Sequence, residues 1–151
     1  MPLPPNSPEQ DVTGDSPIRA LVAEDNDDLR LLLTLRLRML GMEVTSVVNG
    51  EAAVEQVMKA AGDLERPFDL ILMDMEMPIL DGFEATRQLR GLGHLGPIFA
   101  MTAHDPGGMI DCGRFGCDGY VTKPIDWDKL ATTLREWVAH SRGSSAPRTD
   151  V

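Results

Sequence analysis

The chain has few of the residues on which several classes of protein depend. Only two of its 151 residues are cysteine, Cys112 and Cys117, and aromatic residues make up 5%. Two cysteines are too few for a disulfide framework, and their spacing is not that of CxxC redox or zinc motifs. No apolar run reaches the roughly 18 residues that suggest a membrane span. We therefore expect a globular protein with reduced thiols.

Basic residues are also scarce. The chain has 24 Asp and Glu against 14 Lys and Arg, a formal net charge of −10. Negative charge repels nucleic acid phosphates and anionic lipids, so we expect neither a nucleic acid nor a membrane as partner. The N-terminus lacks the basic start and the apolar segment of a secretion signal. The sequence therefore predicts a cytoplasmic protein.

Proline and small polar residues gather at the two ends of the chain. Five of the 11 prolines fall within residues 1–17, and residues 142–151 are small and polar. Such composition does not support a packed core. We expect a disordered N-terminal tail (1–17), one folded domain (18–141) and a flexible C-terminal tail (142–151), which leaves no room for a separate output domain.

Within the domain, short aliphatic runs alternate with longer segments of helical period, which is typical of an α/β fold with a parallel sheet. Strands are predicted at residues 18–23, 43–48, 68–73, 97–101 and 120–122. A helix follows each strand, with Asn49 and Asp126 as N-caps of the second and the last. The helix within residues 105–119 should be short and weak, because this segment carries Pro106 and five glycines.

The first predicted helix is rich in leucine. Five leucines share its helical spacing: Leu29, Leu32, Leu33, Leu37 and Leu40. Three arginines lie among them: Arg30, Arg36 and Arg38. The simplest interpretation is one buried leucine stripe with a basic outer face.

Polar side chains follow four of the predicted strands where each strand ends. They are Glu24 and Asp25, Asp74, Thr102 and Lys123. In open α/β sheets this edge is where ligands bind. Two acids after a strand are most often a solvated turn or a helix cap. Asp74, however, ends a buried apolar run, where an ionised group is costly unless it is paired or bound to a cation.

Three carboxylates in one pocket repel one another, by about 4 kcal/mol for a pair about 4 Å apart at an effective dielectric of about 20. A divalent cation, a proton or Lys123 must offset this repulsion. Mg²⁺ suits the pocket, because it takes oxygen ligands and keeps waters that phosphate oxygens can replace. One carboxylate can then act as a nucleophile toward a phosphoryl group, with Thr102 and nearby N–H groups holding the phosphoryl oxygens.

Four stretches together resemble the receiver domain of two-component response regulators. They are VAEDN (22–26), LMDMEMPILDG (72–82), MTA (101–103) and DGYVTKPI (118–125). They occur in the family's order and cover about residues 18–140. The resemblance implies a flavodoxin-like, doubly wound parallel sheet of five strands in the order 2-1-3-4-5, flanked by five helices. It also implies a phosphoprotein of phosphorelay signal transduction.

The resemblance further implies the chemistry of the acidic residues. Asp74 would accept a phosphoryl group from a histidine kinase or a histidine phosphotransfer protein. Asp25, Asp74 and the main-chain carbonyl of Glu76 would bind Mg²⁺ directly. Glu24, where the family more often has Asp, would act mainly through water.

The remaining site residues would hold or report the phosphoryl group. Lys123, Thr102 and the backbone N–H groups of Met75 and Ala103 would contact its oxygens. Tyr120 would turn inward as Thr102 moves, switching the face formed by the fourth helix, fifth strand and fifth helix. The peptide bond before Pro124 would be cis. Glu76 and His104, each two residues beyond a key position, would tune how fast the phosphoryl group is lost.

Two other functions stay open at this point. Phosphatases and phosphotransferases of the haloacid dehalogenase type also form an aspartyl phosphate, but they need a second Asp where this chain has Glu76. A pseudo-receiver that binds partners without phosphorylation is disfavoured, because all five key positions are filled. We expect a signalling switch rather than an enzyme, with slow self-dephosphorylation at most. It is either a free-standing regulator or, as the LMDMEMPILDG motif favours, the receiver of a hybrid kinase, and its output partner is not named by the sequence.

Overall fold

The computed structural model describes residues 17–62, 67–103 and 114–143. Within these ranges the elements are, in chain order, β1 (Arg19–Ala23), α1 (Asp27–Met39), β2 (Glu43–Val47), α2 (Gly50–Gly62), β3 (Leu70–Asp74), α3 (Gly82–Gly91), β4 (Ile98–Thr102), β5 (Gly119–Thr122) and α5 (Trp127–Gly143). The helix predicted within residues 105–119 falls largely on 104–113, which lie outside the described residues. The last helix continues to Gly143, two residues past the predicted domain boundary.

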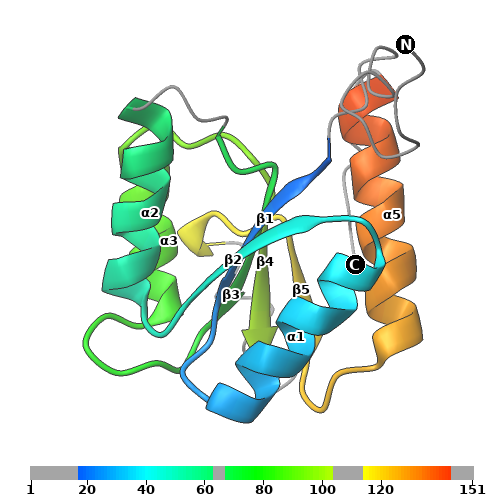
Figure 1. Cartoon of the computed structure of the whole chain (residues 1–151). Coiled ribbons are helices and arrows are strands. Elements are labelled where there is room, and N and C mark those ends of the chain that lie inside the picture. Colours follow the sequence, from blue (N-terminus) through cyan, green and yellow to red (C-terminus); the bar gives the residue numbers. More distant parts are fainter. Residues whose placement is uncertain (1–16, 63–66, 104–113, 144–151) are drawn as a thin grey trace, which may run out of the picture.

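All five strands are parallel, and their order β2-β1-β3-β4-β5 confirms the predicted topology. The helices α2 and α3 cover one face of the sheet, while α1 and α5 cover the other (Figure 1). Every residue of β3 and of β4 is buried. Burial from both sides explains why neither strand alternates apolar and polar residues in the sequence.

Two hydrophobic cores lie on the two faces of this sheet. On β3, Ile71 and Met73 point into the core beneath α2 and α3, whereas Leu70 and Leu72 point into the core beneath α1 and α5. The alternation follows from the two-residue period of a strand. Among the described residues, no helix has the length and apolar character to cross a bilayer.

The predicted helix caps are confirmed. The side chain of Asn49 accepts a hydrogen bond from the N–H of Ala52 at 2.8 Å. Asp126 accepts one from the N–H of Lys129 at 3.1 Å. Both bonds satisfy a backbone donor that has no partner inside the first helical turn.

The outer face of α1 differs from the prediction. Leu33 and Leu37 are fully buried, and the exposed large side chains are Leu31 (60%), Leu32 (40%), Leu35 (47%) and Met39 (79%). The stripe of Leu31, Leu35 and Met39 lies two residues from the buried leucines, which is about 200° around a helix with 3.6 residues per turn. The predicted buried stripe is therefore confirmed at Leu33 and Leu37 but wrong at Leu32, and the outer face carries apolar side chains beside its arginines. Only one side of α1 can face the sheet, and the helix has more leucines than that side holds.

The end of β3 is packed closely against the loop that follows it. A Cβ added to Gly82 would collide with the main chain of Asp74, whereas one added to Gly91 would have no atom within 4 Å. We expect Gly82→Ala to lower the free energy of unfolding by about 2 to 3 kcal/mol, because the main chain cannot move aside cheaply. In urea unfolding, the control Gly91→Ala should leave it unchanged or raise it by up to about 1 kcal/mol. Equal stabilities of the two variants would contradict this packing.

Candidate functional site

The carboxyl ends of the strands bring three acids together. Glu24 and Asp25 directly follow β1, and Asp74 is the last residue of neighbouring β3. One carboxylate oxygen from each lies within 4.8 Å of the others. Glu24 and Asp74 are buried, with 1% and 2% of their surface exposed, while Asp25 is exposed. The cluster thus has a buried floor and one acid open to the surface.

Lys123, just after β5, points into this cluster. Its Nζ lies 2.9 Å from Oε1 of Glu24 and 3.2 Å from Oδ1 of Asp74. Burial disfavours the ammonium, but the hydrogen bond to Glu24 and the charges of both carboxylates outweigh it and raise the pKa of Lys123. Lys123 therefore stays charged and neutralises part of the acidic cluster.

Asp74 carries the largest perturbation at the site. Burial raises the pKa of Asp74 to about 7, and the negative charge of Glu24 adds to the rise. The N–H of Glu76, which donates to Oδ1 at 3.1 Å, and the ammonium of Lys123 oppose it. Three acids facing one ammonium leave negative charge that a proton or a cation can neutralise.

The donor set fits a divalent cation. Its atoms are carboxylate oxygens, which Mg²⁺ prefers. Among the described residues, the buried Oε1 of Glu24 faces the ammonium of Lys123 at 2.9 Å, and it shares this one positive charge with Asp74. A buried carboxylate oxygen in this state is costly and gains from a cation within reach. Glu24, Asp25 and Asp74 could therefore hold Mg²⁺ together.

Cation binding at this site should depend on pH. Since the pKa of Asp74 is about 7, protons compete with the cation below that value. We expect the apparent affinity for Mg²⁺ to fall by up to about tenfold per unit as the pH drops from 7 to 5, and to level off above pH 8. Calorimetric titration at pH 6, 7 and 8 measures this. In Asp74→Asn the dependence in this range should vanish, and a pH-independent affinity in the wild type would contradict the assignment.

The other predicted site residues lie around the same edge. Thr102 ends β4 and is buried, and its register partner on β5 is Thr122, the residue before Lys123. Ala103 and Glu76 are exposed. The peptide bond between Lys123 and Pro124 is cis. His104 lies outside the described residues.

Met75 and Tyr120, which were expected to contact or respond to the phosphoryl group, make other contacts in this structure. The N–H of Met75 donates to the carbonyl of Met101 at 2.9 Å, so a phosphoryl oxygen would have to share or replace that bond. Tyr120 is half-buried and packs against the core under α2 and α3. Its ring is thus on the face of the sheet opposite α5.

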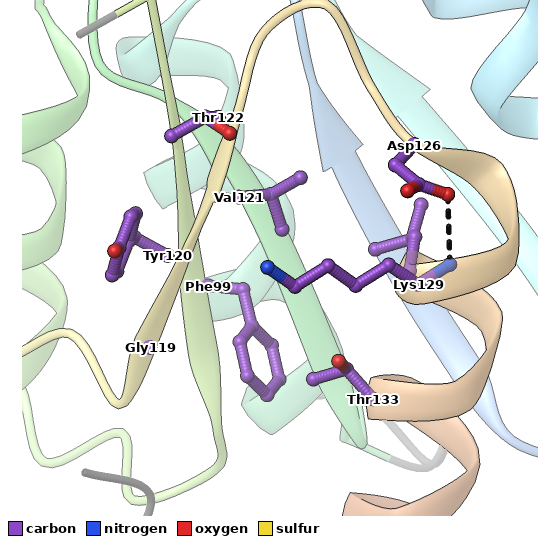
Figure 2. A pocket seen from close by; sticks show the side chains of 9 residues that line it. Phe99, Gly119, Tyr120, Val121, Thr122, Asp126, Lys129 and Thr133 are labelled. Atoms are coloured by element: carbon purple, nitrogen blue, oxygen red, sulfur yellow. Dashed lines mark hydrogen bonds between the residues drawn. The ribbon is translucent and has the colours of Figure 1, made fainter. Parts of the chain in front are cut away.

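A pocket between β5 and α5 was not predicted. Its lining residues are Phe99, Gly119, Tyr120, Val121, Thr122, Asp126, Lys129, Leu130 and Thr133. Lys129 extends across it toward Val121, while Tyr120 points away on the other side of β5 (Figure 2). The pocket belongs to the face for which the resemblance implies switching, and it does not contain Asp74.

Arg90, near the end of α3, was also missed. Its guanidinium donates to the carbonyls of His94 and Gly96, both at 2.8 Å, and to that of Gly116 at 2.9 Å. It also pairs with Asp118 at 2.8 Å. These contacts tie α3 to the segment that leads into β5. No local pattern could reveal them, because two of the partners lie 26 and 28 residues away.

We expect Arg90→Ala to lower the free energy of unfolding by about 2 to 3 kcal/mol, because three carbonyls and a carboxylate lose their donor together. Arg90→Lys should recover less than half, since one ammonium cannot replace the planar fork. Denaturant unfolding measures both. The exposed Arg87, whose partner is Glu84 one helical turn away, serves as the control, and Arg87→Ala should change stability by less than about 0.5 kcal/mol. Equal effects at the two arginines would contradict the clamp.

Comparison with known proteins identifies the family. The model of the response regulator receiver domain matches residues 20–135. The chain belongs to this family. The predicted resemblance and the predicted fold class are thereby confirmed.

The relatives of this receiver domain include proteins of very different length. The two-component response regulator ORR41 of Oryza sativa is 37% identical over 80% of this chain and 94% of its own length. The hybrid signal transduction protein dokA of Dictyostelium discoideum is 38% identical over 78% of this chain. The chain spans only 7% of dokA and 28% of the transcriptional regulatory protein ZraR of Klebsiella oxytoca.

Solved structures agree with the receiver fold. The receiver domain of the sensor histidine kinase PA1611 from Pseudomonas aeruginosa, crystallised with a magnesium ion in its active-site cleft, is 33% identical with a TM-score of 0.72. That match covers 82% of this chain and 99% of the other. The chemotaxis protein CheY4 of Vibrio cholerae is 26% identical with a TM-score of 0.71, over 80% of this chain and 98% of its own.

Proposed function

We propose that Asp74 is the phosphoacceptor of this receiver domain. The observation that carries the proposal is a buried carboxylate at the end of β3, within reach of two further acids and 3.2 Å from the ammonium of Lys123. A solvated turn or a helix cap has no such surroundings. The raised pKa of Asp74 fits a carboxylate whose negative charge is neutralised when the site binds a cation.

The phosphoryl donor is a histidine kinase or a histidine phosphotransfer protein. A carboxylate oxygen of Asp74 attacks the phosphorus, a P–O bond forms, and the P–N bond to the donor imidazole breaks. The electron pair of that bond returns to the imidazole nitrogen. The product is an aspartyl phosphate, and the donor imidazole takes up one proton from water and leaves as neutral histidine.

Mg²⁺ would be held by Asp25, Asp74 and the carbonyl of Glu76, with Glu24 acting through water. When bound, it supplies positive charge that stabilises the transferring phosphoryl oxygens. Lys123 adds an ammonium beside Oδ1 of Asp74. Thr102 and the N–H groups of Met75 and Ala103 orient the phosphoryl oxygens, and Tyr120 moves with Thr102.

Output follows from a change of the face that includes β5 and α5. Both tryptophans lie on α5, and the ring of Trp137 packs edge-on against Phe99 of β4 at a centroid distance of 5.3 Å. The domain works as a signalling module and not as a metabolic enzyme. Glu76 and His104 set the rate of its own slow dephosphorylation. We place this module between two tails, from residue 18 to the end of α5 at Gly143, and in the cytoplasm.

Beryllofluoride, which mimics the phosphoryl group on an aspartate, tests this function. In the presence of Mg²⁺ it should change the fluorescence of Trp127 and Trp137 with saturation at one equivalent bound. The control variant Asp25→Asn should need at least about tenfold more Mg²⁺, since one charged ligand is lost. No fluorescence change in the wild type, together with no binding in calorimetry, would contradict the proposal.

A further inference from the structure

The loop between β3 and α3 holds an isoleucine in an unfavourable backbone conformation. Ile79 has φ of 73°, the only positive φ of a non-glycine residue among those described. This region is a genuine outlier for a β-branched side chain. The N–H of Leu80 donates to the carbonyl of Pro78 at 2.8 Å, across Ile79 alone. Positive φ with such a bond defines the rare and strained form of the γ-turn.

The neighbouring residues impose this conformation. The carbonyl of Leu80 accepts a hydrogen bond from the N–H of Gly50 at 3.0 Å, and its side chain packs on the core. One residue later, Asp81 caps α3 by accepting from the N–H of Glu84 at 2.8 Å. Because the residues after Ile79 are fixed in this way, the bend must be made at Ile79 itself.

Within the described residues, the side chain of Ile79 makes no packing contact with either core that would offset this strain. The side chain of Ile79 is 76% exposed and belongs to neither core. Val48, on the adjoining loop joined to this one by the bond between Gly50 and Leu80, is 47% exposed. The backbone strain lowers the stability of the domain, and an exposed side chain regains none of it by burial. Strain that is retained in this way is concentrated at functional sites.

The position of the loop indicates the function. The loop starts directly after Asp74, which is only 2% exposed at the carboxyl edge of the sheet. A protein that presents a phosphohistidine on a short side chain must bring its own surface against this edge. The loops that surround the acids are then contacted by the donor, whereas a small phosphate donor can enter without touching them.

We propose that Ile79 is an apolar recognition contact for the protein phosphodonor, whose phosphohistidine is surrounded by an apolar surface. The inference rests on the proposed role of Asp74. Ile79 touches the donor and not the reacting atoms, so it sets the rate of transfer from a protein and leaves transfer from small molecules unchanged. Its strained turn holds the side chain outward before the donor arrives, which reduces the ordering that binding requires.

Three variants test the proposal. Ile79→Asn removes the apolar contact and suits positive φ, Ile79→Leu keeps an apolar side chain without β-branching, and Leu95→Asn is the control. Leu95 is 92% exposed and precedes β4, at the opposite edge of the sheet. The small donor is acetyl phosphate. The protein donor is taken from a panel of phosphorylated kinases and phosphotransfer proteins of the source organism, and it is the one that transfers its phosphoryl group to the wild type fastest.

Ile79→Asn should raise the midpoint of thermal unfolding by about 3 °C, because strain is released. It should accept phosphate from acetyl phosphate at the wild-type rate. Its second-order rate constant with the protein donor should fall about tenfold or more, as expected for the loss of one buried aliphatic contact. Ile79→Leu should keep at least about a third of the wild-type rate, and Leu95→Asn all of it.

An unchanged rate of Ile79→Asn with the protein donor overturns the inference. So does a wild type that acetyl phosphate phosphorylates but no member of the panel does. If acetyl phosphate fails to phosphorylate the wild type under conditions that phosphorylate a reference receiver, the proposed role of Asp74 fails instead. The two failures are therefore distinguishable.

Discussion

Asp74→Asn should unfold at higher denaturant concentration than the wild type at pH 8 without divalent cations, although it loses the phosphoacceptor. In the folded domain the pKa of Asp74 is about 7, against 3.8 as its ordinary value. Between these values the folded state binds more protons than the unfolded state, so stability falls as the pH rises through this window. Above pH 7 the wild type carries the full penalty of a buried carboxylate, which the neutral amide avoids.

At pH 8 the free energy of unfolding of Asp74→Asn should exceed that of the wild type by an amount on the order of 2 to 4 kcal/mol, and this difference should shrink toward zero near pH 4. Adding Mg²⁺ should narrow the gap, because the cation stabilises only a wild type that can bind it. Asp126→Asn, an exposed cap that remains a cap, should change stability by less than about 0.5 kcal/mol at either pH. A destabilised Asp74→Asn, or a difference in stability that does not depend on pH, would show that the buried carboxylate of Asp74 does not destabilise the folded wild type.

Lys123→Ala should be destabilised at pH 8 and should accept phosphate without switching. Removing the ammonium leaves the buried carboxylates of Glu24 and Asp74 facing each other without a counter-charge, at a cost of about 2 to 4 kcal/mol. Mg²⁺ should restore part of that stability, since it supplies charge to the same oxygens. Acetyl phosphate should still load the variant, while its tryptophan fluorescence change should drop below about a fifth of the wild-type change, because the bond from β5 to the phosphoryl group is gone.

Lys129→Ala is the matched control for Lys123→Ala. Lys129 is an exposed lysine of α5 that lines the pocket beside β5 (Figure 2). Its removal should affect neither the stability by more than about 0.5 kcal/mol nor the response to Mg²⁺. If both lysine variants lose stability equally, the effect lies in general charge and not in the contacts of Lys123.

Much of the fold and the acidic cluster could be predicted because both depend on local patterns. The unbroken apolar run before Asp74 indicates a strand covered on both faces, and β3 is buried throughout. Carboxyl ends of parallel strands share one edge, so the sequence positions of Glu24, Asp25 and Asp74 were enough to predict that they meet. The N-caps Asn49 and Asp126 were equally local.

What the sequence could not supply depends on direction and distance. Helical period predicted one buried leucine stripe on α1, but not the second, exposed stripe that contains Leu31. The contacts of Arg90 join α3 to the segment before β5 and leave no periodic trace. The positive φ of Ile79 could not be predicted from the sequence, because a glycine such as nearby Gly82 suits positive φ far better than isoleucine does. Packing of the two adjoining loops overrides that local preference.

The central claim is that Asp74 receives the phosphoryl group, and peptide mapping after phosphorylation tests it most directly. The wild type is incubated with acetyl phosphate and Mg²⁺, digested at acidic pH and analysed by mass spectrometry. We expect one phosphoryl group on the peptide that contains Asp74, its loss under mild alkali, and no incorporation when Mg²⁺ is chelated or in Asp74→Asn. Phosphate on any other residue, or equal incorporation in Asp74→Asn, would contradict the account.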